Sequence, residues 1–278
     1  MIQLEILLIS LSLIAYLATA VIYLRHLFGG REFWGRATLT LLIIGLGVHF
    51  LALVVHVLAD PKRALPLVNV LETLSLAAWC LVFVFVLAEL RWRITALGAF
   101  VLPIALAAMV GSFFALHHHA SAAPKFLLEH QALLGVHVTL VLVGYAAFVL
   151  AFCSALAYLL QDRFLRSKHF QGISRQLPPV QVADEAAYRL AALGFPVFTL
   201  GLIIGAIWAY LARPGGWWDP KVVWSIVTWL VFVTYLHARM ASGWKGRKAA
   251  VLLVTGFVCV VATYVLTGLL KAGWHRFV

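Results

Sequence analysis

The chain of 278 residues is 64% hydrophobic and only 11% charged, with a mean hydropathy of +1.01. Soluble domains carry about 25% charged residues, so this composition excludes a soluble domain and indicates a membrane protein. The formal net charge of +11 is spread over short loops between apolar runs, where basic residues report topology and contact with lipid headgroups. We therefore expect membrane lipid, and no nucleic acid, among its partners.

About eight apolar runs are long enough to cross a bilayer, because roughly 20 helical residues rising about 1.5 Å each span its core of about 30 Å. They cover residues 3–24, 38–58, 67–90, 94–116, 132–160, 193–211, 222–240 and 249–270. The backbone of a segment in lipid must satisfy its own hydrogen bonds, so these runs are predicted to be helices. The predicted fold is an all-α polytopic membrane protein, with residues 1–278 forming a single transmembrane domain.

The loops between the runs differ in charge. Eight crossings place both termini on one side, and most of the 21 lysine and arginine residues fall in the loops of the other side. The positive-inside rule makes this basic side cytoplasmic, so both termini are expected on the outer side of a bacterial inner membrane. The first run is followed by Arg25 and Arg31 without a cleavage site, and is predicted to be a retained span. The longest polar stretch, 161–192, is too short for a separate soluble domain, and the fifth run is long enough to extend beyond the membrane.

The three cysteines lie inside predicted spans and form no C-x-x-C pair, so Cys80, Cys153 and Cys259 are interpreted as small apolar core residues. The sequence also lacks a nucleophile–base constellation, a phosphate-binding glycine loop and an H-E-x-x-H motif. We expect no independent catalytic activity.

Histidine and tryptophan gather toward the predicted outer side. Imidazole in a bilayer is costly unless it has a partner. His56 and His137 lie near the outer ends of their runs, and His275 follows the last run. The outer loops add His117, His118, His119, Trp217 and Trp218. His237 lies at the cytoplasmic end of the seventh run, and His49 lies one heptad before His56 on the same helix face.

Each of these residues also has a purely structural interpretation. A single intramembrane histidine more often joins two helices by a hydrogen bond than binds a metal, and the triple histidine suits a solvated loop. Tryptophan at a membrane boundary usually belongs to an interfacial belt, the expected role of Trp34, Trp92, Trp244 and Trp274. Asn69 and Glu72 share a helix face and are either a packing device or an ion site.

The sequence contains a tryptophan-rich motif, Trp217-Trp218-Asp219-Pro220-Lys221 followed by Trp224. With this motif, the chain resembles the CcsA/HemX-type cytochrome c assembly membrane proteins, which handle haem. Further support comes from Tyr235-Leu236-His237, from His137 with Gly144-Tyr145-Ala146, and from 66–73, which is similar to the family's P-x-S-N-x-Y-E-S stretch. Cytochrome c synthetases read W-x-W-D-P-K-E-T-W, whereas here Val222-Val223 replaces Glu-Thr. The chain is thus closer to a compact branch of the family than to the synthetase.

The resemblance implies a non-covalent haem b site. His137 and His275 would be axial ligands of its iron at the outer face, beside the tryptophan-rich loop. His237, with His56 or His49, would correspond to a lower site within the membrane. The chain would deliver haem in cytochrome c assembly, to apocytochrome c or to an assembly partner subunit.

The chemistry of these residues agrees with a haem site. Neutral imidazole is a good iron ligand, and Trp217 and Trp218 can stack on the macrocycle. Lys221 and Arg213 can pair with haem propionates. Asp219 has two candidate roles: to orient a ligating histidine, or to cap the helix that begins at Pro220, which is the expected one.

Two other classes of function are compatible with the sequence. A b-type electron-transfer subunit also places paired haem histidines on facing helices and would exchange electrons with quinol. A haem-free transporter or assembly scaffold would use Asn69 and Glu72 as an ion or proton site.

The predicted orientation is testable with reporter fusions after residues 120, 216 and 278. All three should report the outer side, because charge places the tryptophan-rich loop and the C-terminus there. A cytoplasmic signal from the fusion at 216 would contradict the prediction.

Overall fold

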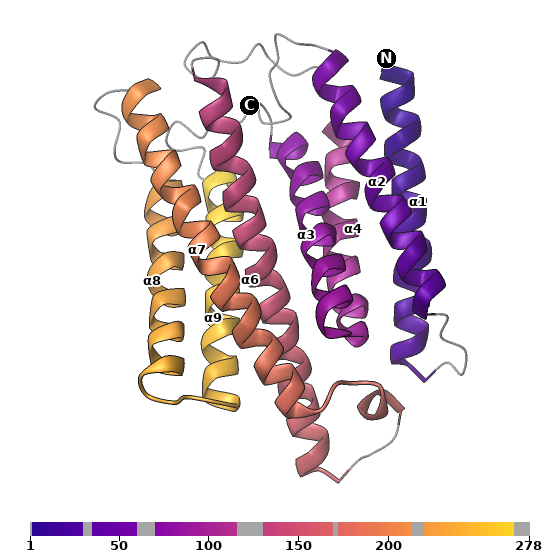
Figure 1. Ribbon diagram of the computed structural model, residues 1–278, viewed down its shortest axis with the longest axis vertical. Helices are drawn as coiled ribbons and strands as arrows, with labels where there is room; N and C mark the ends of the chain where they lie inside the picture. The colour runs from indigo at the N-terminus through magenta and orange to yellow at the C-terminus, as the bar shows by residue number, and fades with distance from the viewer. Residues whose placement is uncertain are drawn as a thin grey trace.

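The computed structural model describes residues 2–29, 35–59, 70–115, 130–168, 172–212 and 220–269. This part of the chain contains eight α-helices and no strand (Figure 1). They are α1 (Ile2–Leu27), α2 (Gly35–Ala59), α3 (Val70–Trp92), α4 (Gly98–Ala115), α6 (Gln131–Arg166), α7 (Val180–Ala212), α8 (Pro220–Met240) and α9 (Arg247–Leu269). Two short 3₁₀ turns, η2 (Thr95–Leu97) and η3 (Gly172–Arg175), precede α4 and α7.

Every predicted run corresponds to one of these helices. Seven of them, α1 to α4 and α6 to α8, are long and apolar enough to cross a membrane within their described residues. The eighth, α9, has 23 residues, which at about 1.5 Å each also exceed the bilayer core. The prediction of an all-α polytopic membrane protein is confirmed.

The largest difference from the predicted boundaries is at α6 and α7. α6 continues to Arg166, as its length had indicated, but α7 begins at Val180, whereas its apolar run begins at 193. The added turns contain Asp184, Glu185 and Arg189 among alanines and leucine. These residues favour a helix without favouring lipid, so hydropathy alone did not detect them.

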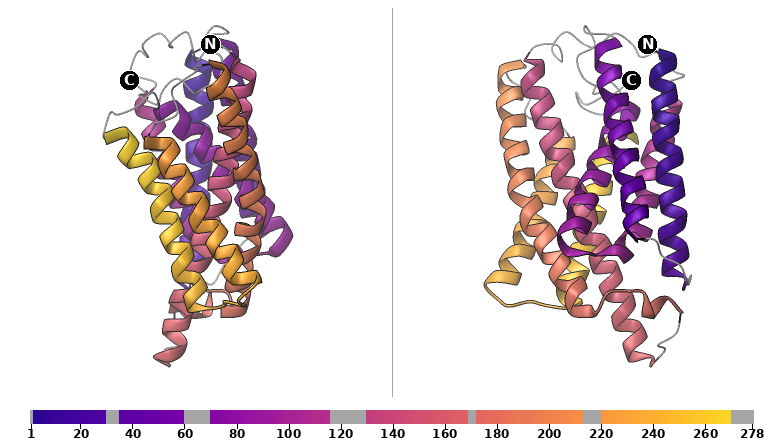
Figure 2. Two further views of the ribbon diagram at one scale, coloured as in Figure 1. Left: turned by 90° about the vertical axis from the view of Figure 1, so that its left-hand side faces the viewer. Right: turned by 45° about the vertical axis from the view of Figure 1, so that its right-hand side comes forward.

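The helices form two groups of four. α1 packs on α2 and α4, and α3 packs on α4, whereas α6, α7, α8 and α9 pack on one another; the contact of α3 with α6 joins the groups (Figures 1 and 2). Fully buried Tyr16, Tyr23 and Phe85 fill the first group. In the second group, the rings of Phe148 and Phe232 stack with centroids 3.5 Å apart.

Glycine brings α6 and α7 into close contact. A Cβ atom at Gly194 would lie 2.6 Å from Cβ of Ala147, and one at Gly201 would lie 2.9 Å from the side chain of Val141. A Cβ at Gly144 would lie 2.7 Å from Cβ of Phe198. In lipid, where helices gain little from hydrophobic burial, such close backbone approach is a main source of helix–helix attraction.

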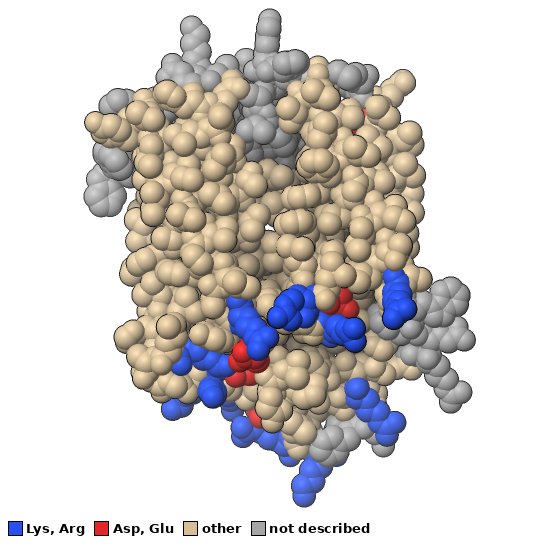
Figure 3. Space-filling model, viewed as in Figure 1, with Lys and Arg blue, Asp and Glu red and all other residues tan. Residues whose placement is uncertain are grey.

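Basic residues collect at one end of the molecule. On the face shown in Figure 3, Lys and Arg gather at the lower end, below a band that is almost entirely uncharged. This end holds the α6–α7 and α8–α9 connections, and α1 begins at the opposite end (Figure 1). The division of the loops into a basic and a less basic side is therefore confirmed for the described residues, and the compartment that each side faces stays a prediction.

Replacing Gly194 by leucine should destabilise the protein by about 1–3 kcal/mol, because the new side chain must displace Ala147 and the backbone of Gly144. Gly47→Leu is the matched control, since nothing lies within 4 Å of a Cβ at this helical position. Thermal unfolding of detergent-solubilised protein measures both variants. Equal melting temperatures would show that the α6–α7 contact tolerates a wider spacing.

Candidate functional site

His137 lies in the second turn of α6 and turns toward α7. Its Nδ1 lies 2.7 Å from the carbonyl oxygen of Gly201. A carbonyl can only accept a hydrogen bond, so Nδ1 carries the proton and Nε2 of the neutral ring carries the lone pair. This is the tautomer that a histidine uses when it binds a metal through Nε2 while a backbone carbonyl holds its other nitrogen.

Gly205 provides the surface on which the ring of His137 rests. A Cβ atom at Gly205 would overlap the Cε1 and Nδ1 atoms of this ring. Gly201 and Gly205 form a G-x-x-x-G pair, one helical turn apart on the same face of α7. The glycines therefore make room for the imidazole as well as for the close approach of the helices.

His49 is fully buried between α1, α2 and α3. Its Nδ1 lies 3.3 Å from the hydroxyl of Tyr16, and its Nε2 lies 3.0 Å from Oγ of Ser75. Both ring nitrogens are thus engaged by neighbouring helices. This geometry favours the structural interpretation of His49 over a role as a ligand.

His56 also faces α1, as its heptad spacing from His49 predicts, but its partner is charged. Its Nδ1 donates to Oε1 of Glu5 at 2.8 Å, and the Glu5 side chain is 8% exposed. A carboxylate on Nδ1 fixes the ring orientation and makes Nε2 the more basic nitrogen. His56 thus differs from His49 in having a charged partner on α1, where His49 has two hydroxyl partners.

His237 is an exposed residue in the last turn of α8, at the basic end of the molecule. Trp224 and Lys221 are half-buried in the first turns of α8, at the opposite end. The structure therefore places His237 at the other end of α8 from Lys221 and Trp224, as the sequence predicts. Pro220 is the first residue of α8, which agrees with its predicted place at the start of this helix.

The remaining predicted site residues lie outside the described residues. They are Asn69, His117, His118, His119, Arg213, Trp217, Trp218, Asp219 and His275, and the same holds for the side chain of Glu72. The outer cluster and the two roles considered for Asp219 stay predictions. Within the described part of the chain, no three His, Cys, Asp or Glu side chains gather in a way that could hold a metal ion. Cys80, Cys153 and Cys259 are buried and unbridged, which confirms their interpretation as core residues.

A polar clamp that the sequence reading missed joins α7 to the α8–α9 connection at the basic end. Nη2 of Arg239 donates to Oδ2 of Asp184 at 2.6 Å, and Nη1 donates to the carbonyl of Trp244 at 3.1 Å. The N–H of Gly246 donates to Oδ1 of Asp184 at 3.0 Å. The guanidinium also lies over the ring of Tyr188, 5.1 Å from its centroid. The sequence shows Asp184 and Arg239 as charged residues near the ends of apolar runs, but their spacing along the chain does not show that they pair.

The sequence also did not reveal the partners of His56 and His137. Glu5, the partner of His56, is an acidic residue inside an otherwise apolar run, and such a residue is expected to be paired. The Gly201–Gly205 pair was visible as a motif, but only the structure shows that it faces His137.

The sequence matches the model of a known protein family. The family model of the cytochrome c assembly protein matches residues 67–275. The chain belongs to this family. The matched segment includes His137, the tryptophan-rich motif, His237 and His275, and excludes α1 and α2 with Glu5 and His56.

Individual relatives are similar in sequence to this protein over most of its length. The chain is 33% identical over 235 residues to the cytochrome c biogenesis protein CcsA of Synechococcus sp. (strain CC9605), covering 76% of this chain and 77% of the relative. CcsA of Mesostigma viride is 29% identical over 304 residues, which cover 100% of this chain and 98% of the relative. CcsA of Chlorella vulgaris is 30% identical over 300 residues, covering 96% and 94%.

The Arg239–Asp184 pair predicts a large effect of a single substitution. Arg239→Gln should destabilise the protein by about 3–5 kcal/mol, because it leaves the carboxylate of Asp184 without its cation in a largely buried place. The matched control Arg166→Gln removes an exposed i,i+4 pair with Asp162 and should cost at most about 1 kcal/mol. Thermal unfolding in detergent measures both.

A double variant separates the ion pair from the packing of the arginine. Asp184→Asn combined with Arg239→Gln should be more stable than the sum of the single changes, since no uncompensated charge is left. Strict additivity would show that the two side chains act independently.

Proposed function

We propose that this multi-pass membrane protein binds haem b non-covalently and delivers it in cytochrome c assembly. The observation that carries the proposal is the tautomer of His137, which presents a basic Nε2 while α7 holds Nδ1. Family membership supplies the context, because its matched segment includes His137, His275 and the tryptophan-rich motif. The relatives named above are called cytochrome c biogenesis proteins.

The residues present fit a haem. A bis-histidine haem needs two neutral imidazoles and an apolar, aromatic surround, and no further protein ligand. His137 and His275 would be the axial ligands, and Trp217, Trp218 and Trp224 would contact the macrocycle. Arg213 and Lys221 would pair with the propionates. When bound, haem supplies the redox-active iron, while this chain binds, orients and shields it.

The contacts that hold the ring of His137 suit the binding of haem and its later release. The hydrogen bond to Gly201 and the flat surface of Gly205 restrict the ring to one orientation, so little rotamer freedom is lost when it binds iron. A histidine on a rigid helix pair also keeps its position when an acceptor protein removes the ligand. Delivery requires these properties and requires no nucleophile or general base.

Placement along the helices supports two haem-handling ends. His137 lies near the start of α6 and His237 near the end of α8, and these are opposite ends of the molecule. We infer that haem enters at the end of His237, with His56 a further candidate ligand, and is held at the end of His137. The acceptor would be apocytochrome c or an assembly partner subunit at the outer face of a bacterial inner membrane.

Replacing His137 or His275 by alanine should lower the haem that co-purifies with the protein by about tenfold, because each change removes one axial ligand. The absorption spectrum of detergent-purified protein measures it through the Soret band. Added imidazole should partly restore the band in both variants. His130→Ala is the matched control, since His130 is an exposed residue that immediately precedes α6.

Two outcomes would contradict the proposal. Unchanged haem content in both variants would reject the axial ligands, and a wild-type protein without a Soret band after haem supplementation would favour a haem-free transporter or scaffold. Rapid reversible reduction of the bound haem by quinol would instead favour the electron-transfer subunit.

A further inference from the structure

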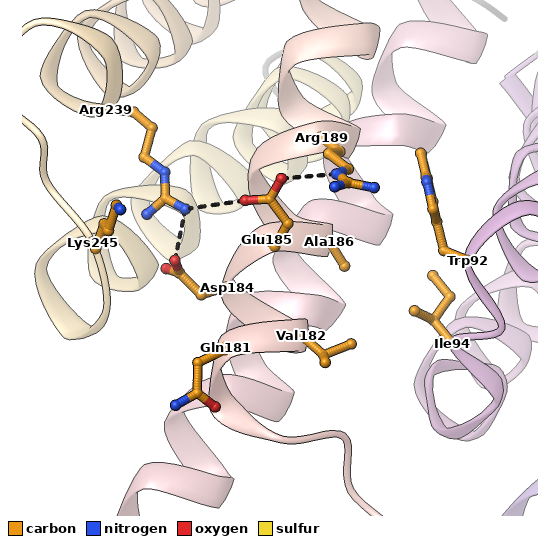
Figure 4. A pocket seen from close by; sticks show the side chains of 10 residues that line it. All are labelled: Trp92, Ile94, Gln181, Val182, Asp184, Glu185, Ala186, Arg189, Arg239 and Lys245. Atoms are coloured by element: carbon orange, nitrogen blue, oxygen red, sulfur yellow. Dashed lines mark hydrogen bonds and ion pairs between the residues drawn. The ribbon is translucent and has the colours of Figure 1, made fainter.

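A pocket opens at the basic end of the molecule, between the two groups of helices. Its volume is about 560 Å³. Trp92, the last residue of α3, and Ile94, just before η2, form one wall, and the first turns of α7 form the other (Figure 4). Arg239 and Lys245, from the end of α8 and the connection to α9, close one side. The proposed haem ligands do not line it.

Charge pairing leaves the pocket with an excess of positive charge. Its lining holds three cations and two carboxylates. Arg239 is committed to Asp184 at 2.6 Å, and Arg189 pairs with Glu185 at 2.8 Å (Figure 4). Within the described residues, Lys245 has no ion pair and is exposed. The pocket therefore suits a ligand with one negative charge.

Arg189 and Lys245 are the two lining cations that are exposed enough to contact a ligand, whereas Arg239 is not. The Arg239 side chain is buried and fixed by the clamp, so it shapes the wall. Arg189 is about half exposed, and its guanidinium lies across the pocket from Trp92 (Figure 4). An arginine has donors enough to hold Glu185 and a second oxygen anion at the same time.

The depth of the pocket matches the headgroup region of a bilayer. The spans of α3 and α8 end at Trp92 and Met240, within a few residues of the lining. Apolar Ile94, Val182 and Ala186 lie beside the cations. A tryptophan at such a boundary has an apolar body for acyl and glycerol groups and an N–H donor for a headgroup oxygen. The ligand is thus expected to be apolar at one end and anionic at the other.

We propose that this pocket binds the phosphate headgroup of an anionic membrane phospholipid, with Arg189 and Lys245 contacting the phosphate and Trp92 the adjoining glycerol region. Basic pockets between transmembrane helices on the cytoplasmic side bind anionic headgroups for this reason. The bound lipid would fill the space between the two groups of helices at the basic end, where α3 and α7 stand apart across the cavity.

The probe is an equimolar mixture of phosphatidylglycerol and phosphatidylcholine in detergent micelles, with retained lipid counted by native mass spectrometry. Wild-type protein should retain phosphatidylglycerol in preference to phosphatidylcholine, whose choline cation meets Arg189 and Lys245. The double variant R189Q/K245Q should retain about tenfold less phosphatidylglycerol. Both side chains are exposed, so the variant should fold, and its helical circular dichroism and elution volume verify this.

The matched control is R166Q/K248Q, which removes two exposed cations from the same end of the molecule but not from the pocket. It should retain phosphatidylglycerol as the wild type does. An equal loss in both double variants would overturn the proposal in favour of general surface charge, and so would unchanged retention in R189Q/K245Q. Displacement of the lipid by millimolar inorganic phosphate would assign the pocket to free phosphate instead.

Haem content of the same preparations keeps this proposal separate from the proposed function. R189Q/K245Q should keep the wild-type Soret band, since no proposed haem residue lines the pocket. If the band is lost together with the lipid, the pocket takes a haem carboxylate and the lipid assignment is wrong.

Discussion

The contact between α6 and α7 is the constraint on which the rest of the structure depends. In lipid, a polar group without a protein partner is costly, and helices attract one another mainly by close packing. Gly144, Gly194 and Gly201 let the two backbones approach until side chains meet backbone atoms directly. Only at this spacing does Nδ1 of His137 reach the carbonyl of Gly201. The chemistry of this histidine is therefore a consequence of glycine spacing on the neighbouring helix.

The need of each polar group in lipid for a protein partner also explains why the intramembrane histidines differ in their hydrogen bonds. His49 lies between a tyrosine and a serine hydroxyl, which take both of its nitrogens. His137 and His56 each have an acceptor at Nδ1, a carbonyl in one case and a carboxylate in the other, and both acceptors leave the basic lone pair on Nε2. The partner of Nδ1 thus sets which nitrogen of the imidazole carries the proton.

Hydropathy and charge predicted the helices and their order well. The thickness of the bilayer sets the length of each span, and lipid excludes polar residues from it, and both effects can be read from each run without knowing its neighbours. The start of α7 at Val180 was missed, since helical propensity in a charged segment has no hydropathy signal. The site was predicted only as residue types and depths. Which residue faces His137 depends on the register of α6 against α7, and its partner Gly201 is 64 residues further along the chain. Pairing Asp184 with Arg239, or His56 with Glu5, likewise requires the packing of separate helices.

The two ends of the molecule differ in their polar contacts, and this difference follows from where charge is tolerated. At the basic end, carboxylates and guanidinium groups pair with one another and tie α7 to the α8–α9 connection, so the surplus cations there can meet an anionic bilayer surface. At the other end, the histidine contacts are a neutral imidazole on a carbonyl and a histidine on a single carboxylate. A bulky apolar ligand with a metal centre suits the second environment, whereas a headgroup phosphate suits the first. The glycine-packed pair of α6 and α7 runs between the two ends and carries polar residues of both, with His137 near the start of α6 and Asp184 near the start of α7.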